Sequence, residues 1–160
     1  MTMARVRARP PVIILYNVYQ SWSPEDRAES ERLTQFMAEG LRALGHRVAL
    51  AEFWKDVRPA LQPFDPDEWI VFNWCEGVED EIGGDARVCA EMEAMGFTYT
   101  GNPPHALRLS VQKGRAKQVL QRWGIPTAPG REFQHPDPVS YTHLRAHETP
   151  EHLVCRLLLE

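Results

Sequence analysis

A pair of histidines near the end of the 160-residue chain has the spacing of a metal site. His143 and His147 are four residues apart, and Glu148 follows the second directly. On a helix the two imidazoles would share one face. That is the arrangement of a zinc-binding pair, to which Cys155 would add a further ligand. The alternative is that these side chains have no chemical role, and the choice depends on the nature of the segment that carries them.

That segment, residues 139–160, resembles translated adapter DNA. The string VSYTHLRAHET resembles a translation of the transposase end sequence that is used to build DNA sequencing libraries. HLVCRLLLE resembles a translation of the flow-cell adapter joined to it, with Pro150 and Glu151 where an index would fall. Segments of this kind are excluded from arguments about fold. We therefore expect a non-native tail at 139–160, no metal site, and a genuine sequence that is the N-terminal piece of something longer.

The composition of the chain excludes several classes of partner. The net charge is -4, and it becomes -3 without the two arginines and three glutamates of the tail. A mildly acidic chain gives no electrostatic reason to expect nucleic acid, and no apolar run is long enough to cross a bilayer. Cys75 and Cys89 form neither a C-x-x-C pair nor a disulfide framework, which favours the cytoplasm. The first 138 residues suffice for one compact domain.

Short apolar runs alternate with helical patterns along the first hundred residues. Runs rich in β-branched residues indicate strands that are buried on both faces. The expected strands are residues 12–16, 47–53, 69–73 and a short one at 97–100. Alternation of strands and helices predicts a parallel sheet covered on both faces, with ligands at the carboxyl ends of the strands.

The first helix has clear start and stop signals. Ser23 can accept a backbone N–H as the N-cap, Pro24 suits the first helical position, and Gly45 supplies a left-handed stop. Apolar residues at steps of three and four predict one core-facing stripe, made of Leu33, Phe36, Met37, Gly40, Leu41 and Leu44.

Two further helical regions are expected after the third strand. An acidic loop runs to residue 84, and Asp85 is expected to cap a helix. A second helical region begins at 102–103, is interrupted around 110–114 and ends near residue 124. Prolines make 55–67 mostly irregular. The core-facing residues of the Asp85 helix are expected to be Val88, Cys89, Met92 and Met95.

The segment from Trp69 to Pro129 contains WIVFNWCEG, GGDARVCAEMEAMGFTYTG and QKGRAKQVLQRWGIPTAP. It resembles the ATP-grasp ligases, specifically D-alanine–D-alanine ligase and its close relatives. In that family a strand ending in F-N is followed by a loop, and a helix with an acidic residue leads to Y-T-G. A D-K…K helix and G-I-P-T-P complete the pattern. The motifs are specific when taken together, whereas any one alone would be weak.

The resemblance implies an α/β fold with a three-layer parallel sheet and helices on both faces. Residues 1–124 would form a Rossmann-like pre-ATP-grasp domain, and 125–138 would begin the ATP-grasp central domain. The implied enzyme is a cytoplasmic ligase of cell-wall (peptidoglycan precursor) synthesis, which uses ATP and Mg²⁺ to join two amino acids and pairs N-terminal surfaces in a homodimer. Its glycine-rich grasp loop and metal carboxylates would lie beyond residue 138. We therefore expect the fragment itself to catalyse nothing.

The resemblance also implies five site residues. Glu76 stands where the ligases carry a histidine before glycine, and its carboxylate could pair with a substrate ammonium, with Gly77 as a close-approach turn residue. Glu29 is the nearest candidate for the glutamate that holds the amine of the first substrate. Lys113 and Lys117 match the lysines of the D-K…K helix, and lysine is suited to phosphate as a mobile point charge.

The sequence departs from the family pattern at several of these positions. Gln112 replaces the acid before Lys113, and the glycine-rich loop after the first strand is missing. The alternative for each charged candidate is a solvated surface charge. Cys75 and Cys89 are expected to be small core residues and not nucleophiles. The remaining histidines, His46, His105 and His135, are too far apart in sequence to indicate a site.

Two functions of other classes are alternatives to the ligase. One is a standalone α/β module that binds a small ligand or a partner without catalysis. The other is a nucleotide-dependent oxidoreductase, which the sequence disfavours because no G-x-G-x-x-G follows the first strand. A downstream glycine-rich loop with acidic metal ligands would distinguish the ligase from the module.

Overall fold

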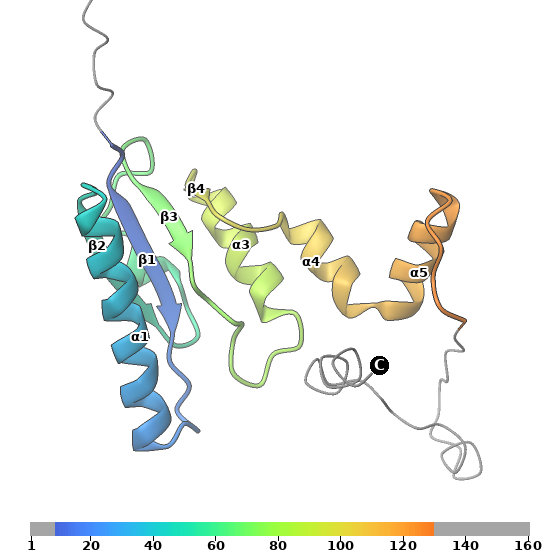
Figure 1. Cartoon of the computed structure of the whole chain (residues 1–160), viewed down its shortest axis with the longest axis horizontal. Helices are drawn as coiled ribbons and strands as arrows, with labels where there is room; N and C mark the ends of the chain where they lie inside the picture. The colour runs from blue at the N-terminus through green and yellow to red at the C-terminus, as the bar shows by residue number, and fades with distance from the viewer. Residues whose placement is uncertain (1–8, 130–160) are drawn as a thin grey trace, which may run out of the picture. The chain divides into compact units, whose positions relative to one another are not determined.

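A computed structural model describes residues 9–129 of the chain. The 139–160 tail, with its histidine pair, lies outside the described residues. The chain divides into two compact units, Met1–Ala116 and Lys117–Glu160, and the first contains the sheet. In the described residues four parallel strands pair in the order β2-β1-β3-β4 (Figure 1). Their bounds are β1 Val12–Asn17, β2 Val48–Phe53, β3 Ile70–Asn73 and β4 Thr98–Tyr99.

Strand β1 is the centre of the sheet. Leu15 is paired with Ala51 of β2 on one side and with Asn73 of β3 on the other. All six residues of β1 are buried, as a strand with both faces covered must be. The expected parallel sheet is therefore confirmed, and the four strands lie close to their predicted positions.

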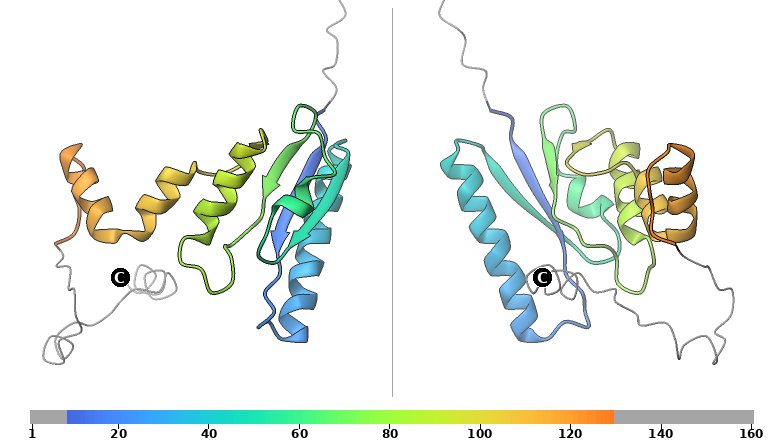
Figure 2. Two further views of the ribbon diagram at one scale, coloured as in Figure 1. Left: turned by 180° about the vertical axis from the view of Figure 1, so that it is seen from behind. Right: turned by 45° about the vertical axis from the view of Figure 1, so that its right-hand side comes forward.

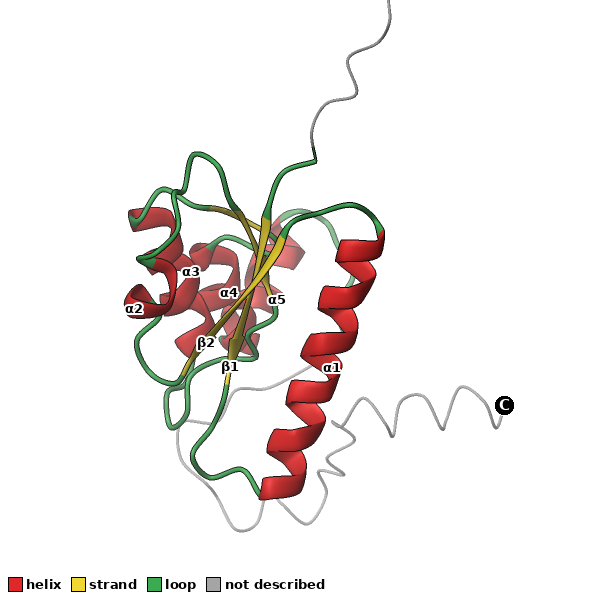
Figure 3. Cartoon of the chain, turned by 90° about the vertical axis from the view of Figure 1, so that its left-hand side faces the viewer, coloured by secondary structure: helices red, strands yellow, loops and turns green. Residues whose placement is uncertain are grey.

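Helices cover both faces of this sheet. Helix α1 (Pro24–Ala43) lies on one face, while α2 (Arg58–Leu61) and α3 (Gly84–Ala94) lie on the other (Figures 2 and 3). Helix α4 (Pro104–Val111) packs against α3, and α5 (Lys113–Arg122) follows after a break at Gln112. The predicted three-layer α/β architecture is confirmed, including the interruption of the last helical region.

The main hydrophobic core lies between the sheet and the α2–α3 side. Side chains of β1 and β3 pack there against the buried face of α3, on which three of the four predicted core residues are fully enclosed. The fourth, Met95, is only partly buried. The most enclosed members of the cluster are Ile13, Leu15, Leu61, Val57, Val71, Val88, Cys89 and Met92.

The predicted core stripe of α1 is wrong in part, since only Met37 and Leu41 of its large side chains are half-buried. The side chains at three of its positions are exposed, with Leu33 at 40%, Leu44 at 58% and Phe36 at 72%. The residues that α1 buries are the smaller Thr34 and Ala38. The face of α1 that contacts the sheet is thus displaced by one position along the sequence from the apolar stripe. Small side chains on that face let the helix backbone approach β1 and β2 closely.

Several local predictions are confirmed and two need correction. The Ser23 hydroxyl accepts a hydrogen bond from the Asp26 amide at 3.1 Å, and Gly45 ends α1 with a φ of +86°. Asp85 does not cap α3. The cap is Gly83, in the left-handed region, so the helix begins two residues earlier than expected. The region 55–67 is less irregular than expected, because α2 forms within it and buries Leu61.

No helix within the described residues is long and apolar enough to span a bilayer.

Replacing Phe36 by alanine should change the free energy of unfolding by less than about 1 kcal/mol, because its side chain faces solvent. Replacing the fully buried Met92 by alanine should cost about 2–5 kcal/mol, through lost burial and the cavity that remains. Urea denaturation followed by circular dichroism measures both. A loss above about 3 kcal/mol for Phe36→Ala would show that the α1 stripe is part of the core after all.

Candidate functional site

Two asparagines end the central strands at the carboxyl edge of the sheet. Asn17 is the last residue of β1, and Asn73 is the last of β3. The side-chain oxygen of Asn17 accepts the Glu76 amide at 3.0 Å, and that of Asn73 accepts the Cys75 amide at 3.3 Å. Ligands of open parallel sheets bind at this edge. The loop that leaves β3 is therefore fastened where a ligand would be expected.

Gly77 occupies a position that only glycine fills without strain. Its φ is +146°, and a Cβ built there would meet the Tyr19 hydroxyl at 3.4 Å. The Cys75 sulfur accepts the Gly77 amide at 3.3 Å and donates to the Gly77 carbonyl at 3.2 Å. Such backbone conformations favour residues without a side chain. The backbone conformation therefore requires glycine here, while the close approach of a substrate to Gly77 stays a prediction.

Glu76 places an exposed carboxylate beside this turn. Its backbone is held by Asn17, while its side chain makes no hydrogen bond or ion pair within the described residues. The pKa of Tyr19 is raised, mainly by burial and further by the nearby Glu76 and Glu79 carboxylates. Glu76 therefore combines a fixed backbone with a carboxylate that remains accessible to a cationic group.

Glu79 joins the loops that follow β1, β2 and β3. Its Oε2 accepts the Gln20 amide at 2.9 Å and the Trp54 indole N–H at 2.7 Å, and its Oε1 accepts the Ser21 amide at 2.8 Å. Hydrogen bonds from the Ser21 side chain, the two amides and Trp54 lower the pKa of Glu79 to about 2. The Glu79 side chain is therefore not simply a solvated surface charge, because its carboxylate is hydrogen-bonded to two loops.

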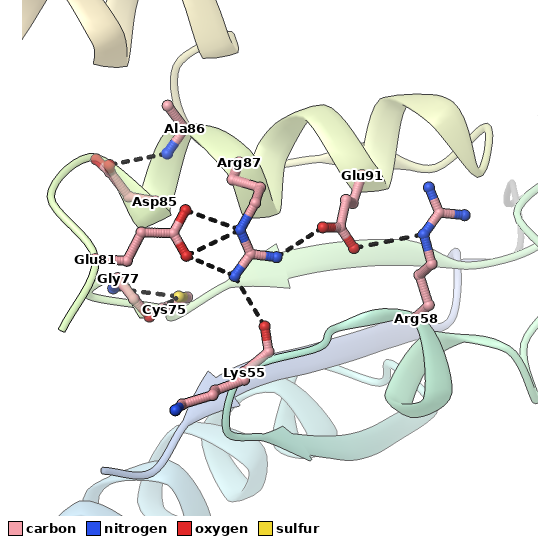
Figure 4. Close-up of polar contacts among 9 residues, drawn as sticks. All are labelled: Lys55, Arg58, Cys75, Gly77, Glu81, Asp85, Ala86, Arg87 and Glu91. Atoms are coloured by element: carbon pink, nitrogen blue, oxygen red, sulfur yellow. Dashed lines mark hydrogen bonds and ion pairs between the residues drawn. The ribbon is translucent and has the colours of Figure 1, made fainter. Parts of the chain in front are cut away.

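Arg87 fastens the other end of the same loop (Figure 4). Its guanidinium donates to both carboxylate oxygens of Glu81 at 2.8–3.0 Å and to Glu91 at 2.7 Å. It also donates to the Lys55 carbonyl at 2.9 Å, and Arg58 lies 3.5 Å from Glu91. Hydrogen bonds to Glu81 and Glu91 raise the pKa of Arg87. This network connects the loop, α3, α2 and the segment after β2.

A shallow, open hollow lies at the tip of this loop. Its volume is about 470 Å³, and it is lined by Tyr19, Ser21 and residues 78–82. Asp80 adopts a φ of +62°, which is unusual for a residue with a side chain. Ile82 is 96% exposed. The hollow is open to solvent at this edge of the described region.

The cysteines of the described region do not provide a nucleophile. Burial is the main cause that raises the pKa of the Cys75 thiol to about 12 and that of Cys89 to about 11. Both thiols are therefore protonated near neutral pH, and the thiolate is the reactive form. Cys89 is fully buried in the core and Cys75 is packed against it, as the sequence predicts.

The other three predicted site residues lie away from this loop in the sequence. Glu29 is exposed on α1, and Arg32 donates to both of its carboxylate oxygens. Lys113 is exposed at the start of α5. The Lys117 ammonium donates to the Ala128 carbonyl at 2.9 Å. Their roles in binding remain predictions.

The sequence reasoning missed several residues that shape the site. The expected strand stops at residue 16, whereas β1 ends at Asn17. The signal for a site there is a polar residue at the carboxyl end of a buried strand. The four-residue spacing of Arg87 and Glu91 also signalled an ion pair on a helix. No local signal pointed to Glu79, because its donors Gln20 and Ser21 are 59 and 58 residues away.

Among residues 9–129 no group of three or more His, Cys, Asp or Glu side chains is arranged to hold a metal ion.

The chain is similar in sequence to known proteins. No protein-family model matches the chain. Curated proteins that carry the name D-alanine--D-alanine ligase do match it.

The similarity to these ligases is moderate and covers part of each protein. One from Moorella thermoacetica is 35% identical over 91 residues, which is 57% of this chain and 28% of the relative. One from a Caulobacter species is 35% identical over 100 residues, 62% of this chain and 30% of the relative. One from Desulfovibrio desulfuricans is 29% identical over 121 residues, 71% of this chain and 38% of the relative. The chain thus matches between 28% and 38% of the length of these relatives.

Replacing Glu79 by glutamine should lower the free energy of unfolding at pH 7, and the deficit should shrink as the pH falls. The folded-state pKa of about 2 lies below the ordinary 4.5. The ionised carboxylate therefore stabilises the fold above the ordinary pKa, and this contribution is lost as the pH drops toward the folded value. Urea titrations at pH 7, 4 and 3 measure it, with the exposed Glu39→Gln as control. An equal deficit at every pH would contradict the assignment.

Replacing Arg87 by lysine should make the loop easier to cleave while the charge is retained. Lysine cannot reproduce the planar fork that contacts Glu81, Glu91 and the Lys55 carbonyl together. Limited proteolysis with a glutamate-specific protease, followed by mass spectrometry, should show faster cutting after Glu79 or Glu81. Arg27→Lys, on the exposed surface of α1, is the matched control. Unchanged cleavage in the Arg87 variant would show that this network does not hold the loop.

Proposed function

We propose that this chain is the N-terminal part of an ATP-dependent carboxylate–amine ligase of the D-alanine–D-alanine ligase type. The observation that carries the proposal is the similarity to proteins of that name. The parallel sheet supports it, because its carboxyl edge carries the loop in which the first amino acid would be recognised. Residues 1–124 would be the pre-ATP-grasp domain and 125–138 the start of the ATP-grasp domain.

The exposed carboxylate of Glu76 is proposed to pair with the ammonium of the first amino acid. Its backbone is held by the buried Asn17, so the position of the loop does not depend on the ligand. Gly77 would let the substrate approach the backbone closely. Glu29 could contribute only by exchanging its present ion pair with Arg32 for the ligand. The substitution of Glu76 for the histidine of the classical ligases points to a cationic group at this place in the substrate.

Lys113 and Lys117 are proposed to face the phosphates of ATP, which supplies the phosphoryl group that activates the substrate carboxylate. Lys113 is exposed and fits this role as a point charge. Lys117 would have to leave the Ala128 carbonyl to do so. The described residues offer no cluster suited to magnesium, so we assign no magnesium ligand to them.

The proposed division of labour is recognition by this part of the chain and catalysis elsewhere. Phosphoryl transfer needs several cations around the transferring group. We therefore propose that the present 160 residues are inactive by themselves, and that the complete enzyme is a homodimer acting on amino acids. The alternative of a standalone binding module is not favoured, because the matching relatives just described are ligases by name.

A gene that continues past residue 138 with native sequence should encode an enzyme that releases phosphate from ATP when D-alanine is added. In that enzyme Glu76→Gln should raise the KM for the first amino acid about tenfold or more, since a charge-assisted pair worth about 1.5–3 kcal/mol is lost. A coupled phosphate-release assay measures both. The control is Glu39→Gln on the exposed surface of α1.

The present chain, by contrast, should bind ATP only weakly in isothermal titration calorimetry. Micromolar affinity would overturn the expectation that the nucleotide site lies mostly elsewhere. A stop codon directly after residue 138 in the native gene, or an unchanged KM in the Glu76 variant, would count against the ligase and against the Glu76 role respectively.

A further inference from the structure

The donors that hold Glu79 have the form of a binding site for a carboxylate. The Gln20 amide, the Ser21 amide and the Trp54 indole N–H converge on one planar group, at 2.9, 2.8 and 2.7 Å. Each carboxylate oxygen has at least one donor of its own. We call the three donors of Gln20, Ser21 and Trp54 the carboxylate socket. They come from the loops after β1 and β2, whereas Glu79 comes from the loop after β3.

The chemistry of the carboxylate socket favours a singly charged, planar anion. All three donors are neutral, so no cation is present among them to offset a second negative charge. A phosphate would bring more oxygens than the socket has donors. The Lys55 ammonium lies 4.4 Å from the centre of the Trp54 ring, which places positive charge near the indole without directing it at the anion. The Ser21 side chain and then these three donors hold the pKa of Glu79 below its ordinary value, because their hydrogen bonds favour the ionised carboxylate.

Exchange would require only the tip of the loop to move, because Val78 is buried on one side of Glu79 and Glu81 is held by Arg87 on the other. This tip lies between Gly77 and Gly83, whose φ angles are +146° and +76°. Between them Asp80 holds a φ of +62° that its side chain disfavours. Glu79 and Ser21 both line the open hollow at this edge, so solvent and small molecules reach the site of exchange.

A further donor, which has no acceptor among the described residues, lies at the end of β1. The Asn17 side-chain nitrogen is buried, with the residue only 3% exposed, and it has no hydrogen-bond partner among the described residues. Its amide is nevertheless near enough to Tyr19 to oppose, in part, the rise in the pKa of that phenol that burial causes. A ligand oxygen at this edge would give that amide an acceptor.

We infer that the carboxylate socket of Gln20, Ser21 and Trp54 is a binding site for a small monocarboxylate, which Glu79 occupies as an internal ligand until an external carboxylate displaces it. This goes beyond the proposed ligase function and does not depend on it. In the closed state Glu79 braces the loops, and in the open state the same donors bind the incoming carboxylate. No covalent step is involved.

The test is a formate titration of the full chain and of its Glu79→Ala variant, at constant ionic strength with chloride as the balancing anion. The readout is the Trp54 indole N–H signal in a ¹⁵N–¹H NMR spectrum, assigned with Trp54→Phe. In Glu79→Ala the signal should shift saturably, because the donors have lost their internal ligand. In the wild-type chain it should shift in the same direction with a midpoint at least about tenfold higher, because Glu79 competes. Glu39→Ala should behave as the wild type.

Each remaining outcome also decides the matter. A saturable shift in the variant but none in the wild type would overturn the inference, since the socket would then be only an internal brace. No shift in either protein would overturn it as well. Tighter binding of phosphate than of formate would overturn the assignment to monocarboxylates. If Glu79→Ala does not fold, Glu79→Gln removes the competing charge with little change in size, and the wild-type titration remains decisive by itself.

Discussion

Backbone amides that leave a parallel sheet at its carboxyl edge lose their strand partners, and each needs a new acceptor if it is not to remain unpaired. In this chain side chains supply the acceptors. Asn17 and Asn73 accept the amides of Glu76 and Cys75, and Glu79 accepts two amides of the loop after β1. The loops at the edge are thus held by long-range side-chain contacts and not by secondary structure of their own. The position of every candidate ligand-binding group depends on these acceptors.

This constraint divides the acidic residues of the loop into different roles. Glu79 is committed to backbone amides and the indole of Trp54, and Glu81 is committed to Arg87. Glu76 alone of these three keeps its carboxylate exposed and without a partner among the described residues. Of the four acidic residues at 76, 79, 80 and 81, Glu79 and Glu81 are therefore braces, whereas Glu76 is accessible beside the strand end. The braces fix the loop, and the accessible carboxylate can respond to a ligand without loss of the loop's position.

The sheet could be predicted from the sequence because its determinants are local. The run of β-branched residues in β1 and the cap at Ser23 depend on neighbours within a few positions. The packing face of α1 could not be predicted in the same way. Its apolar stripe at Leu33, Phe36 and Leu44 is real in the sequence, but the closeness of the sheet selects the small Thr34 and Ala38 instead. The Glu79 contacts were equally hidden, because their partners are nearly sixty residues away.

The chemical character of the described groups supports the proposal that this part of the chain recognises a ligand. Its thiols are protonated at neutral pH, and the Arg87 guanidinium is engaged by two carboxylates and a carbonyl. Lys117 is directed to the Ala128 carbonyl. What the strand edge offers is an exposed carboxylate and a set of neutral N–H donors, and such groups discriminate between ligands by hydrogen bonding and charge. A reaction that accumulates negative charge requires cations focused on one point, whereas Arg87 of α3 is engaged in holding the loop after β3.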